Sequence, residues 1–314
     1  MDALAGLLEG PRASGAFMLR ITMNPPWSIR VQDESPLALA AMVSGEGWVV
    51  YDDDAEPVHL GPGDVAIFRG PDPYLVADQP TTEPQIIVHP GQRCETRDGV
   101  DLSDEMSLGV RTWGNDPGGS VTMLLGVYEE VGAVGQRLLD ALPRILVVSE
   151  ANGDPALVSV LSREITREVP GQEVVLDRLL DLLLISVLRS WFDRPEAEAP
   201  AWYRAHGDPV VGQALRLLHE NPDYPWTVAS LAEKIGLSRA ALARTFTNLV
   251  GAPPMTYLTE WRLTIAADLL RQPEATLDAV SHQVGYSNGF ALSTAFKRVR
   301  GVSPQEYRAA AAAT

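Results

Sequence analysis

The amino-acid sequence predicts a multidomain protein of the α+β class, with a strand-rich first part and an all-helical last part. Three observations lead to this prediction. The chain has 314 residues, more than one compact core usually organises. Short apolar runs separated by turn-forming residues fill positions 17–130, whereas apolar residues recur at helical spacing from about residue 134. From residue 226 onward the chain nearly repeats itself.

Positions 17–130 contain apolar or alternating runs that are typical of short β-strands. Clusters of Gly, Pro, Asn and Asp, such as 61–64 and 70–73, separate these runs. The runs are 18–23, 37–43, 47–51, 65–68, 85–89 and 121–128. Many short strands at this spacing predict an antiparallel barrel or a double-sheet roll.

The segments that follow predict helices at 138–142, 156–168 and 176–192. The last of these gathers apolar side chains on one broad face: Leu179, Leu180, Leu183, Leu184, Val187, Leu188 and Trp191. Such a face packs either on the protein's own barrel or against a second copy of the chain, and both alternatives stay open. The polar, proline-bracketed residues 194–200 predict a linker. The expected domain boundaries are 1–192, 193–205 and 206–314.

Two copies of one helix-turn-helix pattern make up the repeat, offset by 49 residues before the turn and 50 after it. Each copy has a threonine that can cap the first helix, a glycine for a positive-φ turn, and Leu and Phe facing inward from the second helix. These residues are Thr227, Gly236, Leu242 and Phe246 in the first copy and Thr276, Gly285, Leu292 and Phe296 in the second. Ser238, and either Ser287 or Asn288, are expected to cap the second helices. A helix over 255–270 is expected to join the copies.

The distribution of charge leaves the last third of the chain free to approach a polyanion. The net charge is −16, but residues 206–314 hold 10 Lys+Arg against 9 Asp+Glu, so the acidic excess lies before them. Two recognition helices on one face would enter successive major grooves about 34 Å apart. We therefore predict double-stranded DNA as a partner, bound through the major groove, with weak non-specific affinity from this neutral module alone.

The second copy resembles the signature of the AraC-type (AraC/XylS) transcription regulators, from Gly285-Tyr286-Ser287 to Pro304-Gln305-Glu306-Tyr307-Arg308. The first copy, 226–246 with 253–262, is similar to the same family's first motif. The resemblance to this family is tight over residues 210–308. Residues 1–192 more loosely resemble the cupin-like regulatory domain of one branch of the family, a β-barrel with flanking helices. It implies a sequence-specific activator or repressor, a homodimer, and contact with RNA polymerase if the protein is an activator.

The resemblance also assigns residues to DNA. In the family the first recognition helix supplies an arginine to base edges, and the matching position is Arg244. The matching positions in the second helix are Gly289, Phe290 and Thr294, which lack long polar groups, so we expect the first helix to supply more base readout. The expected DNA-binding set is Ser238, Arg239, Ala240, Ala243, Arg244, Thr247, Ser287, Asn288, Gly289, Phe290, Ser293, Thr294, Lys297 and Arg298, the last two contacting phosphate. Arg262 is expected to form a salt bridge with Glu260 or Asp268 instead.

A metal-dependent cupin enzyme tethered to a DNA-binding domain is the alternative from another class. Such a site needs two or three histidines and a carboxylate. Of five histidines only His59 and His89 lie outside the helical part, and no His-x-His pair exists. At the turn where the family often has a histidine, this chain has Tyr74. We therefore predict no catalysis, no metal and no cofactor.

The resemblance implies that the barrel senses a small effector or serves dimerisation. Aromatic side chains are the candidate apolar walls, and an arginine is the candidate partner of an acid group. The candidates are Trp27, Trp48, Tyr74, Trp113 and Tyr128, with Arg69 or Arg111. Each aromatic has the alternative of filling the core. A barrel that binds no ligand and serves only oligomerisation remains a third possibility.

The sequence also predicts a cytoplasmic protein that does not enter a membrane. The longest apolar stretch, 179–188, contains Asp181 and is too short to cross a bilayer. The first 20 residues carry Asp2 and Glu9 where a signal peptide would be basic. The single cysteine, Cys94, cannot form an internal disulfide, and we regard it as an incidental thiol in preference to a redox sensor.

Overall fold

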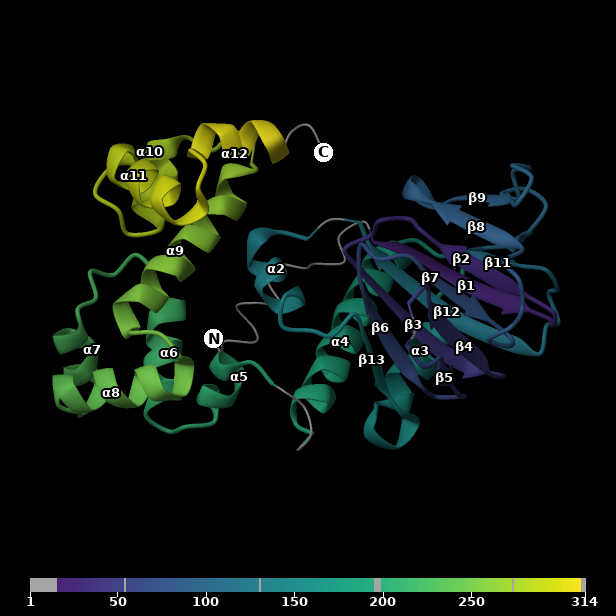
Figure 1. Ribbon diagram of the computed structural model, residues 1–314, viewed down its shortest axis with the longest axis horizontal. Coiled ribbons are helices and arrows are strands. Elements are labelled where there is room, and N and C mark those ends of the chain that lie inside the picture. Colours follow the sequence, from purple (N-terminus) through teal and green to yellow (C-terminus); the bar gives the residue numbers. More distant parts are fainter. Residues whose placement is uncertain (1–15, 54, 130, 195–198, 273, 312–314) are drawn as a thin grey trace. The chain divides into compact units, whose positions relative to one another are not determined.

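The computed structural model describes residues 16–53, 55–129, 131–194, 199–272 and 274–311 (Figure 1). These residues form two compact units, each with its own core. The strand-rich unit comprises residues 16–131 and 142–194, and the helical unit comprises 132–141 together with 199–311. The helical unit is therefore not a contiguous stretch of sequence, because a short segment between two strands belongs to it.

The strand-rich unit is built from two sheets. The seven-stranded sheet has the order β10-β11-β1-β12-β3-β6-β13, and the six-stranded sheet has the order β5-β4-β7-β2-β8-β9. The strands are β1 Phe17–Met23, β2 Ser28–Val31, β3 Leu37–Ser44, β4 Gly47–Tyr51, β5 Val58–Leu60, β6 Val65–Arg69, β7 Tyr74–Ala77, β8 Ile86–His89, β9 Arg93–Thr96, β10 Ser107–Gly109, β11 Thr112–Gly114, β12 Val121–Tyr128 and β13 Ile145–Val148. Every run expected to form a strand does so.

Most strand pairs that the structure describes are antiparallel, and two are parallel. Strand β1 pairs with β11 in parallel, and β2 pairs with β8 in parallel. In both cases a long excursion returns the chain to the sheet in its original direction, which parallel pairing requires. The central pair β12–β3 keeps an antiparallel register, with Leu125 opposite Ala40.

Two helices cover the seven-stranded sheet of this unit. These are α3 (Pro155–Glu164) and α4 (Gln172–Phe192). A Cβ built on Gly126 of β12 would lie 2.5 Å from the Leu180 side chain, so this leucine of α4 packs directly on the strand backbone at the glycine. The leucine face of α4 therefore packs on its own sheet. Phe192 is buried on this face, whereas Leu179 and Trp191 are only half-buried.

The helical unit contains the expected repeat. Its helices are α2 Ala133–Leu139, α5 Ala201–His206, α6 Val211–Glu220, α7 Val228–Lys234, α8 Arg239–Val250, α9 Pro254–Leu270, α10 Leu277–Gln283, α11 Gly289–Arg300 and α12 Pro304–Ala311. The helix predicted at 138–142 in fact ends at Leu139. The predicted linker spans 193–205. Its residues 195–198 lie outside the described residues, and its residues 201–205 belong to helix α5.

The caps and turns of both copies follow the sequence pattern. Thr227 and Thr276 accept hydrogen bonds from backbone N–H groups of α7 and α10. Gly236 and Gly285 have φ values of 73° and 75°. Asn288, not Ser287, caps the second recognition helix, because its Oδ1 accepts from the backbone N–H of Ala291 at 2.9 Å. The inserted residue of the second copy therefore precedes the cap, and Asn288 is the structural counterpart of Ser238.

The joining helix α9 holds the two copies together through Arg262. The Arg262 guanidinium donates to the backbone carbonyls of Pro222 at 2.6 Å and Tyr224 at 2.8 Å, which corrects the expected salt bridge to Glu260 or Asp268. A Cβ on Gly285 would lie 2.7 Å from both Arg262 Nη2 and the Asp223 carbonyl oxygen. The segment before the first copy and the turn of the second copy therefore meet at this guanidinium.

Helix α2 packs on the same joining helix. The Asp268 carboxylate of α9 accepts hydrogen bonds from the backbone N–H groups of Ala133 and Val134, at the start of α2. The guanidinium of Arg137 lies 5.5 Å from the centroid of the Tyr257 ring. Burial raises the pKa of Asp268, opposed by these backbone hydrogen bonds. Asp268 is thus a helix cap supplied from a distant part of the chain.

The two turn glycines allow a matched test of this geometry. Gly236→Ala should lower the free energy of unfolding by about 1–2 kcal/mol, the cost of a Cβ in the left-handed region, because nothing lies within 4 Å of the added atom. Gly285→Ala should cost roughly 1–3 kcal/mol more, because its Cβ meets the Asp223 backbone. Urea unfolding followed by circular dichroism measures both, and equal losses would contradict the close approach at Gly285.

Candidate nucleic-acid interface and barrel cavity

The first recognition helix, α8, exposes two basic side chains. Leu242 and Phe246 are fully buried against the helical core, whereas Arg239 and Arg244 are exposed. Among the described residues no carboxylate lies within salt-bridge distance of either guanidinium. Of the other predicted contact positions on this helix, Ser238 and Ala240 are exposed, and Ala243 and Thr247 are half-buried.

The second recognition helix, α11, begins with a glycine that the structure buries. The Gly289 N–H donates to Asp278 Oδ1 of α10 at 2.9 Å, and a Cβ at Gly289 would lie 2.8 Å from the same oxygen. The expectation that Gly289 faces DNA is therefore wrong, because its backbone is occupied and it has no side chain. Its counterpart in α8 is the exposed Arg239. The second copy thus gives up a basic surface position for an additional helix cap.

The remaining surface of α11 is apolar at its start and basic at its end. Phe290 is 83% exposed, the largest exposed fraction among the large hydrophobic side chains described. The Thr294 hydroxyl donates to the Phe290 carbonyl oxygen at 2.9 Å, so its proton is already engaged and its methyl group remains available. Lys297 and Arg298 are exposed in the last turn. Ser287 and Asn288 are also exposed, and Ser293 is half-buried.

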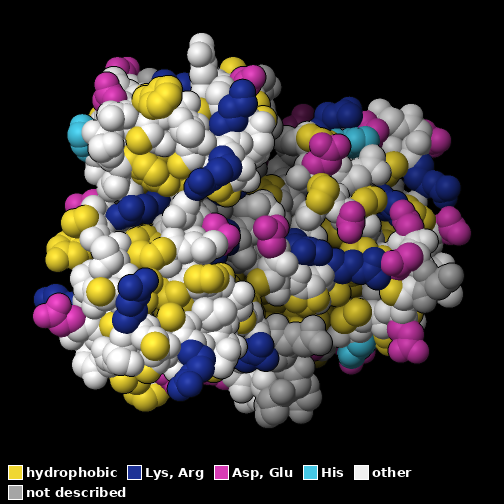
Figure 2. All heavy atoms as spheres, turned by 60° about the vertical axis from the view of Figure 1, so that its left-hand side comes forward, with side chains coloured by type: hydrophobic (Ala, Val, Ile, Leu, Met, Phe, Trp, Pro, Cys, Tyr) yellow, Lys and Arg dark blue, Asp and Glu magenta, His cyan; other side chains and the backbone are white. Residues whose placement is uncertain are grey.

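Several basic side chains of the helical unit already bind acceptors within this unit. Arg300 donates to Thr264 Oγ1, and Arg308 donates to the carbonyl oxygens of Leu270 and Ala275. Arg262 is half-buried, and burial lowers its pKa. Figure 2 shows Lys and Arg side chains dispersed over the forward face of the helical unit, separated by neutral and hydrophobic atoms. This face offers isolated cations and no continuous basic stripe.

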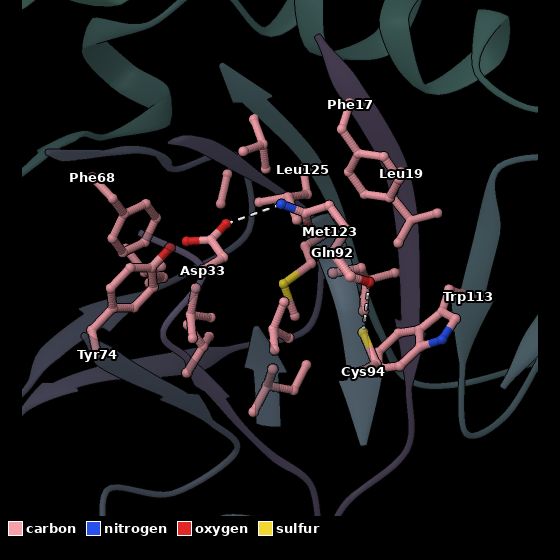
Figure 3. Close-up of a pocket in the computed structure, with 18 of the residues that line it drawn as sticks. Phe17, Leu19, Asp33, Phe68, Tyr74, Gln92, Cys94, Trp113, Met123 and Leu125 are labelled. Carbon is pink, nitrogen blue, oxygen red and sulfur yellow. Dashed lines mark hydrogen bonds between the residues drawn. The ribbon is translucent and has the colours of Figure 1, made fainter. Parts of the chain in front are cut away.

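A cavity of about 190 Å³ lies between the two sheets of the strand-rich unit. Figure 3 shows Phe68 beside Tyr74 on one side and Trp113 beside Cys94 on the other. The Phe68 and Tyr74 rings stack with centroids 4.4 Å apart. The described lining is almost entirely aliphatic or aromatic, and Asp33 is the one charged residue within this described part. The sequence did not single out Asp33, because an Asp-Glu-Ser run after a strand is typical of an ordinary turn.

The structure brings two of the seven predicted effector residues to this cavity, Tyr74 and Trp113. Trp27 is fully buried in the core, and Trp48 lies against His59 with ring centroids 4.7 Å apart. Tyr128 lies buried beside Asp181 of α4, and burial raises its pKa. Arg69, at the end of β6, and Arg111, in the turn between β10 and β11, are outside the lining. The expected arginine partner for an acid group is therefore wrong for this cavity.

The two histidines of the strand-rich unit have other partners. His59 Nε2 lies 3.4 Å from Glu46 Oε2, and His89 Nε2 lies 2.8 Å from Glu95 Oε1. Within the part of the chain that the structure describes, no three His, Cys, Asp or Glu side chains gather as metal ligands would. The helices that the structure describes include none with the length and apolar character needed to cross a membrane.

Comparison with known proteins matches both units to described families. A family model described as Cupin matches residues 2–193, and one described as Helix-turn-helix domain matches residues 231–310. The chain is 30% identical over 312 residues to a putative AraC-like transcription regulator of Streptomyces lividans, covering 98% of each protein. It is 26% identical over 315 residues to the HTH-type transcriptional regulator AlkR of Acinetobacter baylyi, covering 98% of this chain and 99% of the relative.

A solved structure, the DNA-binding domain of AdpA in complex with a target DNA, is similar to one third of the chain. The identity is 31%, the match covers 33% of this chain and 92% of that one, and the TM-score is 0.31. Together the family matches confirm the fold class expected from the sequence, a cupin-like domain followed by a helix-turn-helix module.

The thiol of Cys94, on the cavity wall, should be unreactive at neutral pH. Burial raises its pKa to about 11, so the protonated form persists where a free cysteine is already partly ionised. Alkylation by iodoacetamide at pH 8 should be about a hundredfold slower in the folded protein than in urea. Mass spectrometry reads this directly, since the chain has one cysteine. Native and unfolded rates within tenfold of each other would contradict the buried thiol.

Proposed function

The chain belongs to the family of AraC-like transcription regulators, and on this basis we propose how it recognises DNA and what controls it. It is a DNA-binding regulator with an N-terminal cupin domain. We propose that its two recognition helices contribute unequally, with α8 supplying most hydrogen bonds to base edges. The observation that carries this proposal is the contrast between the exposed Arg244 of α8 and its counterpart in α11, Thr294.

Helix α8 has the chemistry for base readout. An arginine can donate two hydrogen bonds to guanine O6 and N7, and Arg244 is exposed without a carboxylate partner among the described residues. The supporting positions on the same helix are Ser238, Arg239, Ala240, Ala243 and Thr247. Ser238 caps the start of α8, Gly251 ends it in the left-handed conformation, and Gly236 forms the turn before it. Helix α8 therefore needs no rearrangement to present this face.

Helix α11 has a different chemistry. Phe290 and the Thr294 methyl group suit thymine methyl groups, and Lys297 and Arg298 suit phosphates. Ser287, Asn288 and Ser293 lie beside them, although the Asn288 side chain is engaged as a cap. The near balance of charge in 206–314 supports a homodimer as the tight-binding form, because each module alone attracts phosphate weakly.

The cavity supports a sensing role for the first domain. In this proposal residues 1–192 bind a small effector without catalysis, and residues 206–314 bind DNA. Residues 193–205 link these two domains. The protein acts in the cytoplasm. An effector would shift the population between arrangements that permit or forbid operator binding, and an activator would also contact RNA polymerase. A saturating effector that changes neither operator affinity nor transcription would refute the coupling.

Arg244→Ala tests the assignment of α8. Affinity for the operator should fall by about 1–3 kcal/mol, and discrimination between guanine and other bases at one position should be lost. Lys297→Ala is the matched control. Losing a phosphate contact lowers the affinity for all DNA sequences alike, and it reduces the slope of log binding constant against log salt concentration by about one. Fluorescence anisotropy with the operator taken from genome-wide binding sites measures both. Unchanged discrimination in Arg244→Ala would refute this role.

Deoxyuridine tests the assignment of α11, because uracil lacks the thymine methyl group. Replacing each thymine of the half-site bound by α11 should reveal one or two positions where affinity falls roughly fourfold, about 0.8 kcal/mol for a lost apolar carbon. In Phe290→Ala the same replacements should have little further effect. If the wild-type protein binds the operator and each deoxyuridine-substituted operator with equal affinity, α11 does not contact thymine methyl groups.

A further inference from the structure

We propose that the cavity of the strand-rich unit takes a compact apolar molecule whose polar end donates a hydrogen bond to Asp33. An amine or an alcohol fits this description, and an organic acid does not. The inference rests on the proposed sensing function, and it names the class of effector that the site selects. It reverses the expectation from the sequence, which paired an arginine with an acid group.

The body of the ligand is determined by the wall. Strands β1, β11 and β12 of one sheet and β2, β7 and β9 of the other contribute apolar side chains to the lining. The ring of Trp113 and the stacked pair of Phe68 and Tyr74 provide flat surfaces at separate places in the cavity (Figure 3). Burial raises the pKa of Cys94 to about 11, so its thiol is neutral and adds to the apolar wall.

The polar end is determined by the hydrogen bonds that Asp33 already makes. Its Oδ2 accepts from the Ser35 hydroxyl at 2.7 Å and from Gln92 Nε2 at 3.0 Å, and its Oδ1 accepts from the Ser35 N–H at 3.2 Å. All three donors are neutral. A carboxylate has about four acceptor positions, so one remains for a ligand. In Figure 3 the oxygen that is not bonded to Gln92 is turned toward Phe68 and Tyr74.

Charge at this end of the cavity opposes an acid. No Lys or Arg is among the lining residues that the structure describes, and no described basic group forms an ion pair with Asp33. A small hollow of about 10 Å³ beside the cavity shares Asp33 and Tyr74 with it and adds a second carboxylate, Asp72. A ligand carboxylate placed here would leave water without gaining a cation, whereas an ammonium group would gain one acceptor and compensate the charge of Asp33.

The volume limits the size of the ligand. A dry protein cavity of about 150 Å³ lined by Leu, Ile and Phe accepts benzene. At about 190 Å³ the present cavity has room for one ring and a short substituent. Derivatives of ethylbenzene therefore match both the volume and the flat walls, and they carry different polar ends on one body.

Four such probes test the proposal on the full chain: 2-phenylethylamine, 2-phenylethanol, ethylbenzene and phenylacetate. Calorimetric titration should give the tightest binding for the amine, then the alcohol, with phenylacetate at least tenfold weaker than the amine. Asp33→Asn should weaken the amine at least tenfold, and Asp33→Glu should retain the order of the four probes. Asp98→Asn is the matched control, because it removes the same charge from an exposed turn, and it should leave all four affinities unchanged.

The outcomes separate the ligand class from the sensing function. If phenylacetate or ethylbenzene binds as tightly as the amine, the assignment to Asp33 is overturned although the cavity remains a binding site. If none of the four probes binds, this ligand class is ruled out, whereas the sensing function is refuted only by an effector that binds and leaves operator affinity and transcription unchanged. Loss of amine binding in Asp33→Asn with an unchanged melting temperature of the free protein supports the assignment. If Asp33→Asn binds the amine as well as the wild type does, the assignment fails.

Discussion

The spacing of the two recognition helices depends on one half-buried guanidinium, that of Arg262. Desolvation lowers its pKa, and two backbone carbonyl oxygens compensate its charge in place of the carboxylate that the sequence predicted. Backbone carbonyl groups are rigid acceptors. The Arg262 side chain therefore holds helix α9 at a fixed position against the backbone of Pro222 and Tyr224. Gly285 closes the arrangement because only a residue without a Cβ fits against it. Caps, turns and buried Leu and Phe then position each recognition helix relative to this point.

The repeat conserves its interior and varies its surface within one chain. Both copies use the same types of cap, turn and core residue, which are the groups that determine a helix-turn-helix backbone. The outer positions have diverged: Arg239 corresponds to Gly289, and Arg244 corresponds to Thr294. A glycine at position 289 leaves room for the Asp278 carboxylate, which accepts a hydrogen bond from the Gly289 N–H and occupies the space that a side chain would fill. The second copy has gained a cap where the first has kept a cation.

Periodicity and turn chemistry predicted most of the fold. Long apolar strands such as β3 and β12 were recognisable, whereas β5, β7 and β13 have only three or four residues and little pattern. The helix caps followed from residue type and spacing, except that only the structure distinguishes Asn288 from Ser287. The site was less predictable. Arg262 pairs with carbonyl groups, which no sequence position identifies. Asp33 acquires significance only because β2 and its turn place it against a cavity formed by distant strands.

Helix α2 makes the order of synthesis relevant to folding. It lies between β12 and β13, yet its N-terminus is capped by Asp268 and its Val134 packs with Trp261 of α9. More than a hundred residues separate its last residue, Leu139, from the first residue of α9, Pro254. At a translation rate of roughly 5–20 residues per second, α2 therefore waits several seconds for its partner. The strand-rich unit can pair its strands in that interval, but the helical unit is completed only when nearly the whole chain has left the ribosome.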